Sequence, residues 1–311
     1  MAFFEAIWEI FTSDSTYVNA ALFAGLLLFA ASGEWVAERA GTINISVEGM
    51  LLAGAFTSAV GYDLTDSVIV ALVAGALGGA IVASVQAEMS HRLPADQFVV
   101  GLTLNILLLG LVGFLDREID TVTRAASKWD IPLLSDLPLV GQALFSQPWP
   151  FYLLYVLVPF SWWLMFRTRW GLEVRASGED PQSADVSGID VNKRRRQTIY
   201  WAGITSGLGG AYLVFVQVGR FDPGIVSGRG FIAIAAVIFG GWTLKGTVAG
   251  CIVFAGALSF RLSLQVLGYD QVNSEFLQAL PFLVTIFGMA IFATRVRPPA
   301  ALARPFIRGL K

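Results

Sequence analysis

The stretch "SVIVALVAGALGGAIVASVQA", residues 67–87, carries no charged side chain over 21 residues. An α-helix of about 20 apolar residues spans the roughly 30 Å of hydrocarbon in a lipid bilayer. The strands of a membrane β-barrel would alternate polar and apolar residues at every second position, and this stretch does not alternate. It therefore predicts one membrane-spanning helix.

Comparable stretches recur along the chain and predict the fold class. Of the 311 residues, 55% are hydrophobic and only 14% are charged, whereas about a quarter of the residues of a soluble protein are charged. We therefore predict an all-α polytopic membrane protein with about eight full transmembrane helices and one short or broken membrane segment. Besides 67–87, the full spans are expected at 17–36, 43–62, 98–115, 150–166, 198–217, 246–268 and 275–293, and the short segment at 228–242.

Lys and Arg collect in two of the polar regions that flank these spans. Cytoplasmic loops are enriched in Lys and Arg, which predicts that the loop 167–197 and the tail 294–311 are cytoplasmic and that the N-terminus lies outside. We expect a single transmembrane domain over 1–311. It would begin with a possible interfacial helix at 1–15 and contain an outer loop at 116–149.

Small residues four positions apart occur within several predicted spans. Pairs such as Gly75 with Gly79, and Gly203 with Gly207, allow two helix backbones to approach each other closely. We interpret these glycines as helix-packing residues and assign them no role in transport.

Two predicted spans carry polar residues four positions apart, which places them on one helical face. Asn44 and Glu48 lie at the start of the second span, and Gln97, Gly101 and Asn105 lie along the fourth. Polar groups inside a membrane often mark a transport path, so one interpretation is a substrate-permeable cavity lined by these two faces. The alternative is that Asn44 and Gln97 cap helices while Asn105 bonds a neighbouring backbone.

The polar stretch "RASGEDPQSADVSGIDVNKRRRQ", residues 175–197, separates two apolar spans. Asp180 followed by Pro181 is typical of a helix N-cap with proline in the first helical position. Gly188 then suits the end of that helix about two turns later. A short helix in a cytoplasmic loop is explained by docking to a soluble partner. A merely solvated loop would account for the basic run 193–196 but not for the capped helix.

The chain lacks the sequence patterns of a self-contained enzyme. It has no phosphate-binding G-x-x-x-x-G-K-[ST] loop, no metal-spaced cluster and no nucleophile beside a base. The single histidine, His91, is expected in a polar loop at the surface, where a lone imidazole is a poor metal site. We therefore expect no cofactor in this chain, no binding of nucleic acid, and ATP used only on another subunit.

Four segments, taken in order, resemble the signature segments of bacterial ABC-importer permeases. They are "GTINISVEGMLLAGAF", "ADQFVVGLTLN", "RASGEDPQSADVSGID" and "GRGFIAIAAVIFGGW". The branch is the one that groups ribose, branched-chain amino acid and nucleoside permeases. The resemblance covers roughly 18–293, and within the branch the chain looks most like the smaller permease subunit of nucleoside importers.

This resemblance implies that "GEDPQSADVSGI" is the coupling helix, which fits into a groove of the ATPase subunit. The residues assigned to coupling are Gly178, Glu179, Asp180, Pro181, Ala184 and Gly188. Ala184 is expected on the exposed face, where a small side chain permits close approach. A charge-reversed Arg194 or Arg195 would serve as a control for this contact.

The resemblance also implies a set of partners and a place in the cell. The partners are ATPase subunits that carry ATP and Mg, a second and longer permease subunit, an extracytoplasmic binding protein and membrane lipid. The expected location is the bacterial cytoplasmic (inner) membrane, and the expected cargo is a small polar solute, most specifically a nucleoside. A sugar or a branched-chain amino acid is the alternative cargo. A different class is an ion-coupled secondary transporter, which could recruit Glu48 and the short 229–241 segment.

Overall fold

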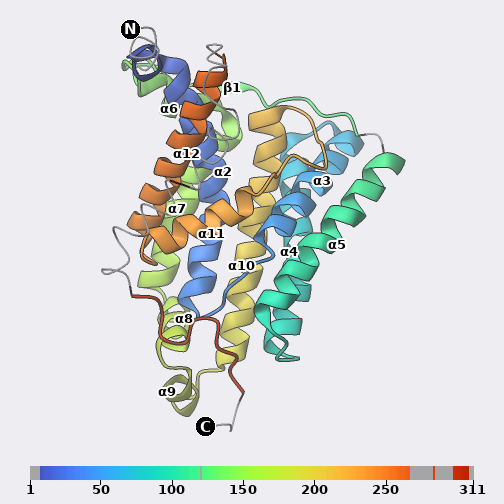
Figure 1. Cartoon of the computed structure of the whole chain (residues 1–311), viewed down its shortest axis with the longest axis vertical. Coiled ribbons are helices and arrows are strands. Elements are labelled where there is room, and N and C mark those ends of the chain that lie inside the picture. Colours follow the sequence, from blue (N-terminus) through green and yellow to red (C-terminus); the bar gives the residue numbers. More distant parts are fainter. Residues whose placement is uncertain (1–7, 120, 267–282, 284–296, 308–311) are drawn as a thin grey trace.

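The computed structural model describes residues 8–119, 121–266, 283 and 297–307. Most of these residues are helical (Figure 1). The helices are α2 (Asp14–Arg39), α3 (Val47–Thr65), α4 (Val68–His91), α5 (Gln97–Glu118), α6 (Gly141–Phe145), η1 (Trp149–Leu153), α7 (Leu154–Arg167), α8 (Arg169–Glu179), α9 (Pro181–Val186), α10 (Val191–Tyr212), η2 (Leu213–Val218), α11 (Arg229–Phe239) and α12 (Leu244–Val266).

The prediction of an all-α polytopic membrane protein is confirmed, but the count of about eight spans is not. Six helical stretches within the described residues are long and apolar enough to cross a membrane. The helix α3, predicted at 43–62, is not one of the six, because it begins only at Val47 and carries Glu48 and Asp63 near its two ends. The short segment predicted at 228–242 corresponds to the shorter apolar helix α11, and the predicted span 275–293 lies outside the described residues.

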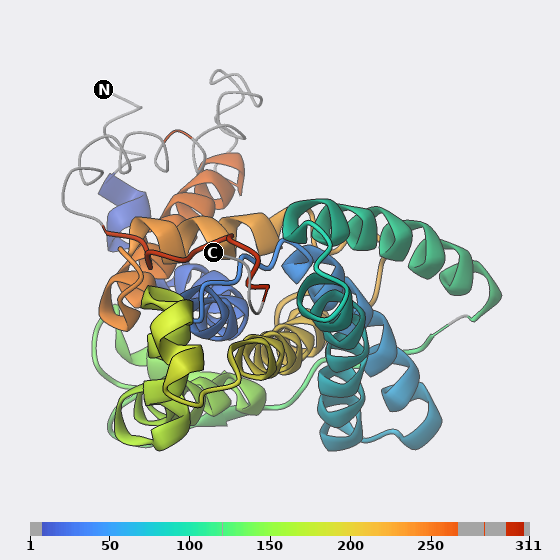
Figure 2. The same cartoon turned by 90° about the horizontal axis from the view of Figure 1, so that it is seen from below.

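The helix α10 lies at the centre of the bundle and packs against α2, α3 and α4 (Figure 2). Its contact with α4 depends on the predicted glycine pairs. A Cβ atom added at Gly79 or at Gly203 would lie under 3.0 Å from a backbone atom of the other helix, and one added at Gly207 would lie under 3.0 Å from the Gly75 carbonyl oxygen. The interpretation of these glycines as packing residues is therefore confirmed.

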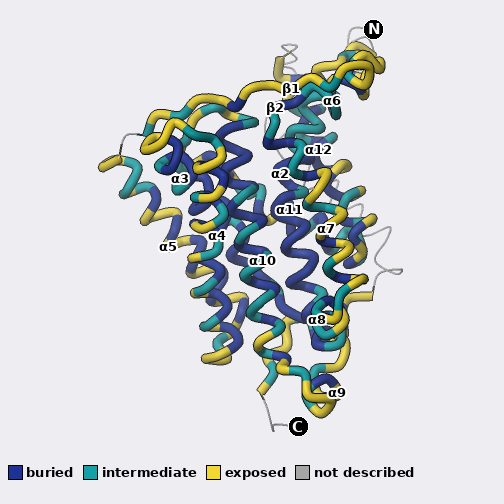
Figure 3. The backbone as a smooth tube through the Cα atoms, turned by 180° about the vertical axis from the view of Figure 1, so that it is seen from behind, coloured by how far each residue is buried: buried dark blue, intermediate teal, exposed yellow. Residues whose placement is uncertain are grey.

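Burial along the backbone separates the centre of the bundle from its outer helices (Figure 3). The core contains Trp35, Tyr212 and Phe215, each fully buried. In contrast, α5 turns an exposed apolar face outward, with Ile106 and Leu109 on it. In a membrane protein an exposed apolar face of this kind contacts lipid or another apolar partner.

Three connecting regions differ from the sequence-based expectation. The connection 116–149, predicted to be an outer loop, contains a two-stranded antiparallel hairpin, β1 (Lys128–Asp130) with β2 (Ser146–Pro148), together with the short helix α6. The loop 167–197 is mostly helical, because α8, α9 and the first turns of α10 fill it. Of the possible interfacial helix at 1–15, residues 8–12 are helical and residues 1–7 lie outside the described part.

Candidate substrate cavity and coupling segment

A cavity of about 440 Å³ lies between α3, α5 and the segment that leads into α11. Its polar side chains include Glu48, Asn105 and Ser227, and most of its remaining surface is apolar. The apolar lining residues are Leu52, Leu102, Ile106, Leu109, Pro223, Val226 and Phe231. The cavity therefore combines a few polar groups with an apolar wall, as small-molecule sites usually do.

The carboxylate of Glu48 caps the N-terminus of α11. Its Oε1 accepts a hydrogen bond from the backbone N–H of Gly228 at 2.6 Å, and its Oε2 accepts one from Gly230 at 2.7 Å. The first N–H groups of a helix have no partner inside the helix and favour a negative charge. Both glycines are needed for this contact: Gly228 has a φ of 82°, and a Cβ at Gly230 would lie 2.6 Å from the Glu48 nitrogen.

The predicted polar stripe of α5 does lie on one face of one helix, and this face contacts the turn before α3. The amide of Asn105 donates from Nδ2 to the Ile45 carbonyl at 2.8 Å and accepts from the Gly49 N–H at 2.8 Å. Gln97 accepts a hydrogen bond from the Ile43 N–H at 3.0 Å. The bonds of Asn105 to a neighbouring backbone agree with the alternative interpretation, in which the polar residues hold helices together. However, Asn105 also borders the cavity.

The expectation that Asn44 shares a helical face with Glu48 is wrong. The helix α3 begins at Val47, so Asn44 belongs to the preceding turn. It is completely buried, its Oδ1 accepts from the Ser46 hydroxyl at 2.7 Å, and its Nδ2 contacts the sulfur of Met50 at 3.4 Å. Of the four predicted pathway residues, the cavity unites Glu48 with Asn105, and its lining does not include Asn44 or Gln97.

The loop 223–228 and Phe231 also line the cavity, and sequence reasoning missed them. The available signal was the glycine pair in "GRGF" just ahead of the short apolar helix. A pair of this kind lets another group approach the first backbone N–H groups of a helix closely. The sequence could not show that Glu48, 180 residues earlier, is the group that does so.

At the opposite end from the hairpin, α8 leads directly into the short helix α9 (Figure 1). The predicted N-cap is confirmed: Asp180 Oδ1 accepts from the N–H groups of Gln182 and Ser183, both at 3.1 Å. Pro181 occupies the first helical position, and Gly188, with a φ of 87°, follows the end of the helix. The ends of this helix could thus be predicted from local residues alone.

The pKa of the Asp180 carboxyl is lowered, first by the hydrogen bond from the Ser183 hydroxyl. A carboxyl whose pKa is lowered by folding stabilises the fold above its ordinary pKa, near 4, and loses that effect as the pH falls through the lowered value. We expect D180A to increase hydrogen exchange in peptides spanning 181–187, whereas D180N, which keeps an acceptor, should remain protected even in acid. Equal exchange in D180A and wild type would contradict the capping role.

The expectation that Ala184 lies on the exposed face of α9 is wrong. Ala184 is only 4% exposed, because it lies on the side of α9 that faces the protein. Its carbonyl accepts a hydrogen bond from the Ile189 N–H at 3.0 Å. The exposed residues of α9 are Gln182, Ser183 and Val186, and they are followed by the exposed Ser187 and Gly188 just after the helix. Val186 is 90% exposed, which makes it the most prominent apolar side chain of this segment.

Gly178 and Glu179 contact α2 rather than forming part of a free helix. Gly178 is buried, and a Cβ there would lie under 3.0 Å from the Arg39 carbonyl oxygen. Glu179 forms an ion pair with Arg39 at 3.9 Å, and its side chain is 56% exposed. A pair so open to solvent contributes little to stability. The close backbone approach at Gly178 therefore determines how α8 sits against α2.

The basic run 193–196 is not a solvated loop. Arg195 is completely buried, Arg194 pairs with Glu173 on α8, and Arg196 pairs with Glu88 on α4 at 2.8 Å. The surface position expected for His91 is also wrong: it is 5% exposed, and its Nε2 lies 3.0 Å from the Thr42 hydroxyl. Within the described residues, no group of three or more His, Cys, Asp or Glu side chains could hold a metal ion.

Comparison with known proteins places this architecture in a transporter family. Residues 16–293 match the family described as branched-chain amino acid transport system, permease component. The chain is 32% identical to the nucleoside ABC transporter permease protein NupC of Lactococcus lactis over 94% of this chain and 96% of that protein. It is 33% identical to the guanosine ABC transporter permease protein NupQ of Bacillus subtilis, over 93% and 95%.

More distant relatives include the ribose import permease protein RbsC of Escherichia coli, 26% identical over 88% of this chain and 82% of that protein. The relatives are permease subunits and not enzymes, and the ATPase of such a transporter is a separate subunit. This relationship decides against an ion-coupled secondary transporter. The match over residues 16–293 shows that the chain belongs to the branched-chain amino acid transport system permease family and is the permease component of an ABC importer.

Proposed function

We propose that this permease forms the translocation path for a nucleoside, which passes through the cavity between α3, α5 and α11. The observation that carries the proposal is the pairing of Glu48 and Asn105 with an apolar wall that includes Phe231. Ribose hydroxyls can donate to the carboxylate, whose oxygens keep further lone pairs beside the Gly228 and Gly230 bonds. The base can stack on the aromatic ring.

The family and the exposed surfaces support a proposed assembly. ATP and Mg would act on separate ATPase subunits, and an extracytoplasmic binding protein would deliver the nucleoside. A second, longer permease subunit would close the cavity beside α5, where Leu102, Ile106 and Leu109 are exposed. The proposed location is the bacterial cytoplasmic (inner) membrane, with the N-terminus outside, the C-terminus in the cytoplasm, and α9 as the coupling helix.

The nucleoside proposal is tested in proteoliposomes that contain the complete transporter, with radiolabelled guanosine. We expect ATP-dependent uptake that excess unlabelled nucleoside suppresses and that leucine leaves unchanged. A sugar is the second candidate, because the relatives include a ribose permease and sugar hydroxyls would suit the same polar pair. Uptake that free ribose suppresses as strongly as guanosine does would favour the sugar.

The role of Glu48 is tested by E48Q. The amide that replaces Oε2 cannot accept from the Gly230 N–H, and the charge at the α11 N-terminus disappears. We expect the KM for guanosine uptake to rise about ten-fold, the scale of one lost hydrogen bond to a charged group. E118Q, at the exposed end of α5, serves as the matched control. Unchanged kinetics in E48Q would remove Glu48 from the path.

Accessibility gives an independent test of the path, in a background in which the buried Cys251 is replaced by alanine. Single cysteines at Ser227 and Asn105 should react with a small water-soluble thiol reagent, and guanosine should slow both reactions. A cysteine at the completely buried Asn44 should stay unlabelled. Fast labelling at Asn44, with none at the two cavity positions, would move the path to the other side of the turn before α3.

A further inference from the structure

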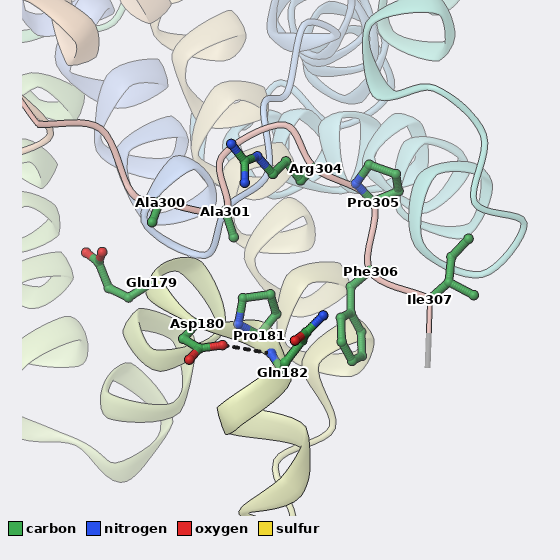
Figure 4. Close-up of a pocket in the computed structure, with 10 residues that line it drawn as sticks. All are labelled: Glu179, Asp180, Pro181, Gln182, Ala300, Ala301, Arg304, Pro305, Phe306 and Ile307. Atoms are coloured by element: carbon green, nitrogen blue, oxygen red, sulfur yellow. Dashed lines mark hydrogen bonds between the residues drawn. The ribbon is translucent and has the colours of Figure 1, made fainter. Parts of the chain in front are cut away.

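The C-terminal tail, residues 297–307, runs across the inner ends of α2 and α8, beside the start of α9 (Figure 4). Two backbone hydrogen bonds fix its course: the Ala301 N–H donates to the Gly178 carbonyl at 2.9 Å, and the Ala303 N–H donates to the Gly41 carbonyl at 3.1 Å. The tail therefore touches both the C-terminal end of α8, just ahead of α9, and the turn that follows α2.

Arg195, in the second turn of α10, forms hydrogen bonds to the tail, to α8 and to the turn after α2. Its guanidinium donates to four backbone carbonyls: Ala40 at 3.0 Å, Arg304 at 2.6 Å, and Ser177 and Ala301 at 3.4 Å each. Its side chain is completely buried. A buried guanidinium must satisfy its N–H groups to be tolerated, so each carbonyl that moved away would leave an unsatisfied donor.

The backbones at this junction leave little room for adjustment. Gly41 has a φ of 88°, and a Cβ there would lie 2.7 Å from Arg195 Nη2. Gly178 is equally confined against Arg39. Two separate glycines thus permit one compact contact among α2, α8, α10 and the tail. Packed contacts of this kind shift as units more readily than they deform.

The inner part of α2 is in turn bonded to the segment after α11. Trp35 Nε1 donates to the Trp242 carbonyl at 2.9 Å, and Trp242 Nε1 donates to the Glu38 carboxylate. The other end of α11 is capped by Glu48 in the cavity. A rigid connection between α9 and α2 would therefore continue, through buried hydrogen bonds, to the polar wall of the cavity.

We propose that Arg195 and the C-terminal tail form a strap that makes α8, α9 and the inner end of α2 a single moving unit. The proposal rests on the proposed role of α9 in receiving motion from the ATPase. In it Arg195 is a positioning residue: it touches neither the substrate nor ATP. Without the strap, α9 can move while α2 stays behind, and ATP is hydrolysed without transport.

The test compares three variants of the complete transporter in proteoliposomes: R195M, a deletion of residues 300–311, and both together. We expect each single variant to lower the guanosine molecules transported per ATP about ten-fold, within the range for residues on a coupling route. The double variant should be no worse than either, because both changes break one device. R304M is the matched control, since the strap uses only the carbonyl of Arg304.

Two outcomes overturn the proposal. Losses that multiply in the double variant would show that Arg195 and the tail act independently. An unchanged transport-to-ATP ratio in the deletion variant would overturn it even if R195M failed to assemble. R195K, which keeps a charge but offers fewer donors in a different geometry, should recover only part of the ratio.

A readout that needs no substrate separates this proposal from the nucleoside proposal. Gln182 on α9 and Phe306 on the tail line one groove (Figure 4), so cysteines at these two positions can be bridged by a short bifunctional reagent. If the strap moves with α9, the bridging rate is the same with and without ATP. A rate that changes several-fold with ATP would contradict the strap, whatever solute the transporter carries.

Discussion

A leucine in place of Gly207 is expected to prevent this permease from accumulating in a folded form. A Cβ at Gly207 would lie under 3.0 Å from the Gly75 carbonyl oxygen on α4. The obstacle is backbone and not a flexible side chain, so the two helices would have to separate. Overpacking a core costs about 1–3 kcal/mol and occasionally more, and we expect this site to reach at least the upper part of that range.

The effect should be large because α10 is the central helix of the bundle. Its contact with α4 runs along a whole face, through Gly75, Gly79, Gly203 and Gly207. Separating the helices at one glycine would loosen the contact at the other three. The measurement is the yield of monodisperse protein in detergent, together with its melting temperature.

G110L on α5 is the matched control, since a Cβ at Gly110 would meet no atom within 4 Å. It should behave like wild type. Wild-type yield and melting temperature in G207L would mean that α4 and α10 do not approach as closely as the structure shows.

An aspartate in place of Val186 is expected to abolish transport without unfolding the permease. Val186 is 90% exposed at the tip of α9, and burying an exposed valine side chain in a contact stabilises that contact by about 1.5 kcal/mol or more. A buried, unpaired carboxylate in the docked state would weaken association with the ATPase strongly. The variant should insert into the membrane with a normal yield and fail to co-purify with the ATPase.

The burial of Ala184 determines the effect expected of A184W, in which a tryptophan replaces it. A tryptophan there has no exposed side on which to obstruct docking. It would instead displace the packing beneath α9, so hydrogen exchange within α9 should rise as transport falls. In V186D the exchange of α9 should remain close to wild type while ATPase association is lost. A184W therefore tests whether transport needs the packing of α9, and V186D tests whether it needs the exposed surface of α9.

V122D provides the matched control for V186D. Val122 is an exposed valine near the C-terminal end of α3, where its N–H donates to Asp63. This change should leave ATPase association intact. Normal ATPase association in V186D would remove the tip of α9 from the docking surface.

Several features were predictable from the sequence because the residues that decide them are neighbours. A run of apolar residues is enough to indicate a membrane helix. Asp180, Pro181 and Gly188 define a short helix through contacts within a few residues, and the structure confirms both of its ends. The glycine pairs indicated close helix packing, since four residues return to the same face of a helix.

Which helices those glycines would bring together was decided only by the tertiary structure. The same holds for the burial of Ala184, His91 and Arg195 and for the cap that Glu48 provides to α11. Arg195 bonds a carbonyl 155 residues away, and Glu48 bonds an N–H 180 residues away. The sequence by itself determined the apolar spans and the local helix boundaries, because these depend on interactions within about one or two helical turns. The cavity and the junction of the tail with α2 required the folded bundle, because burial and hydrogen bonding there depend on which distant backbones come within reach.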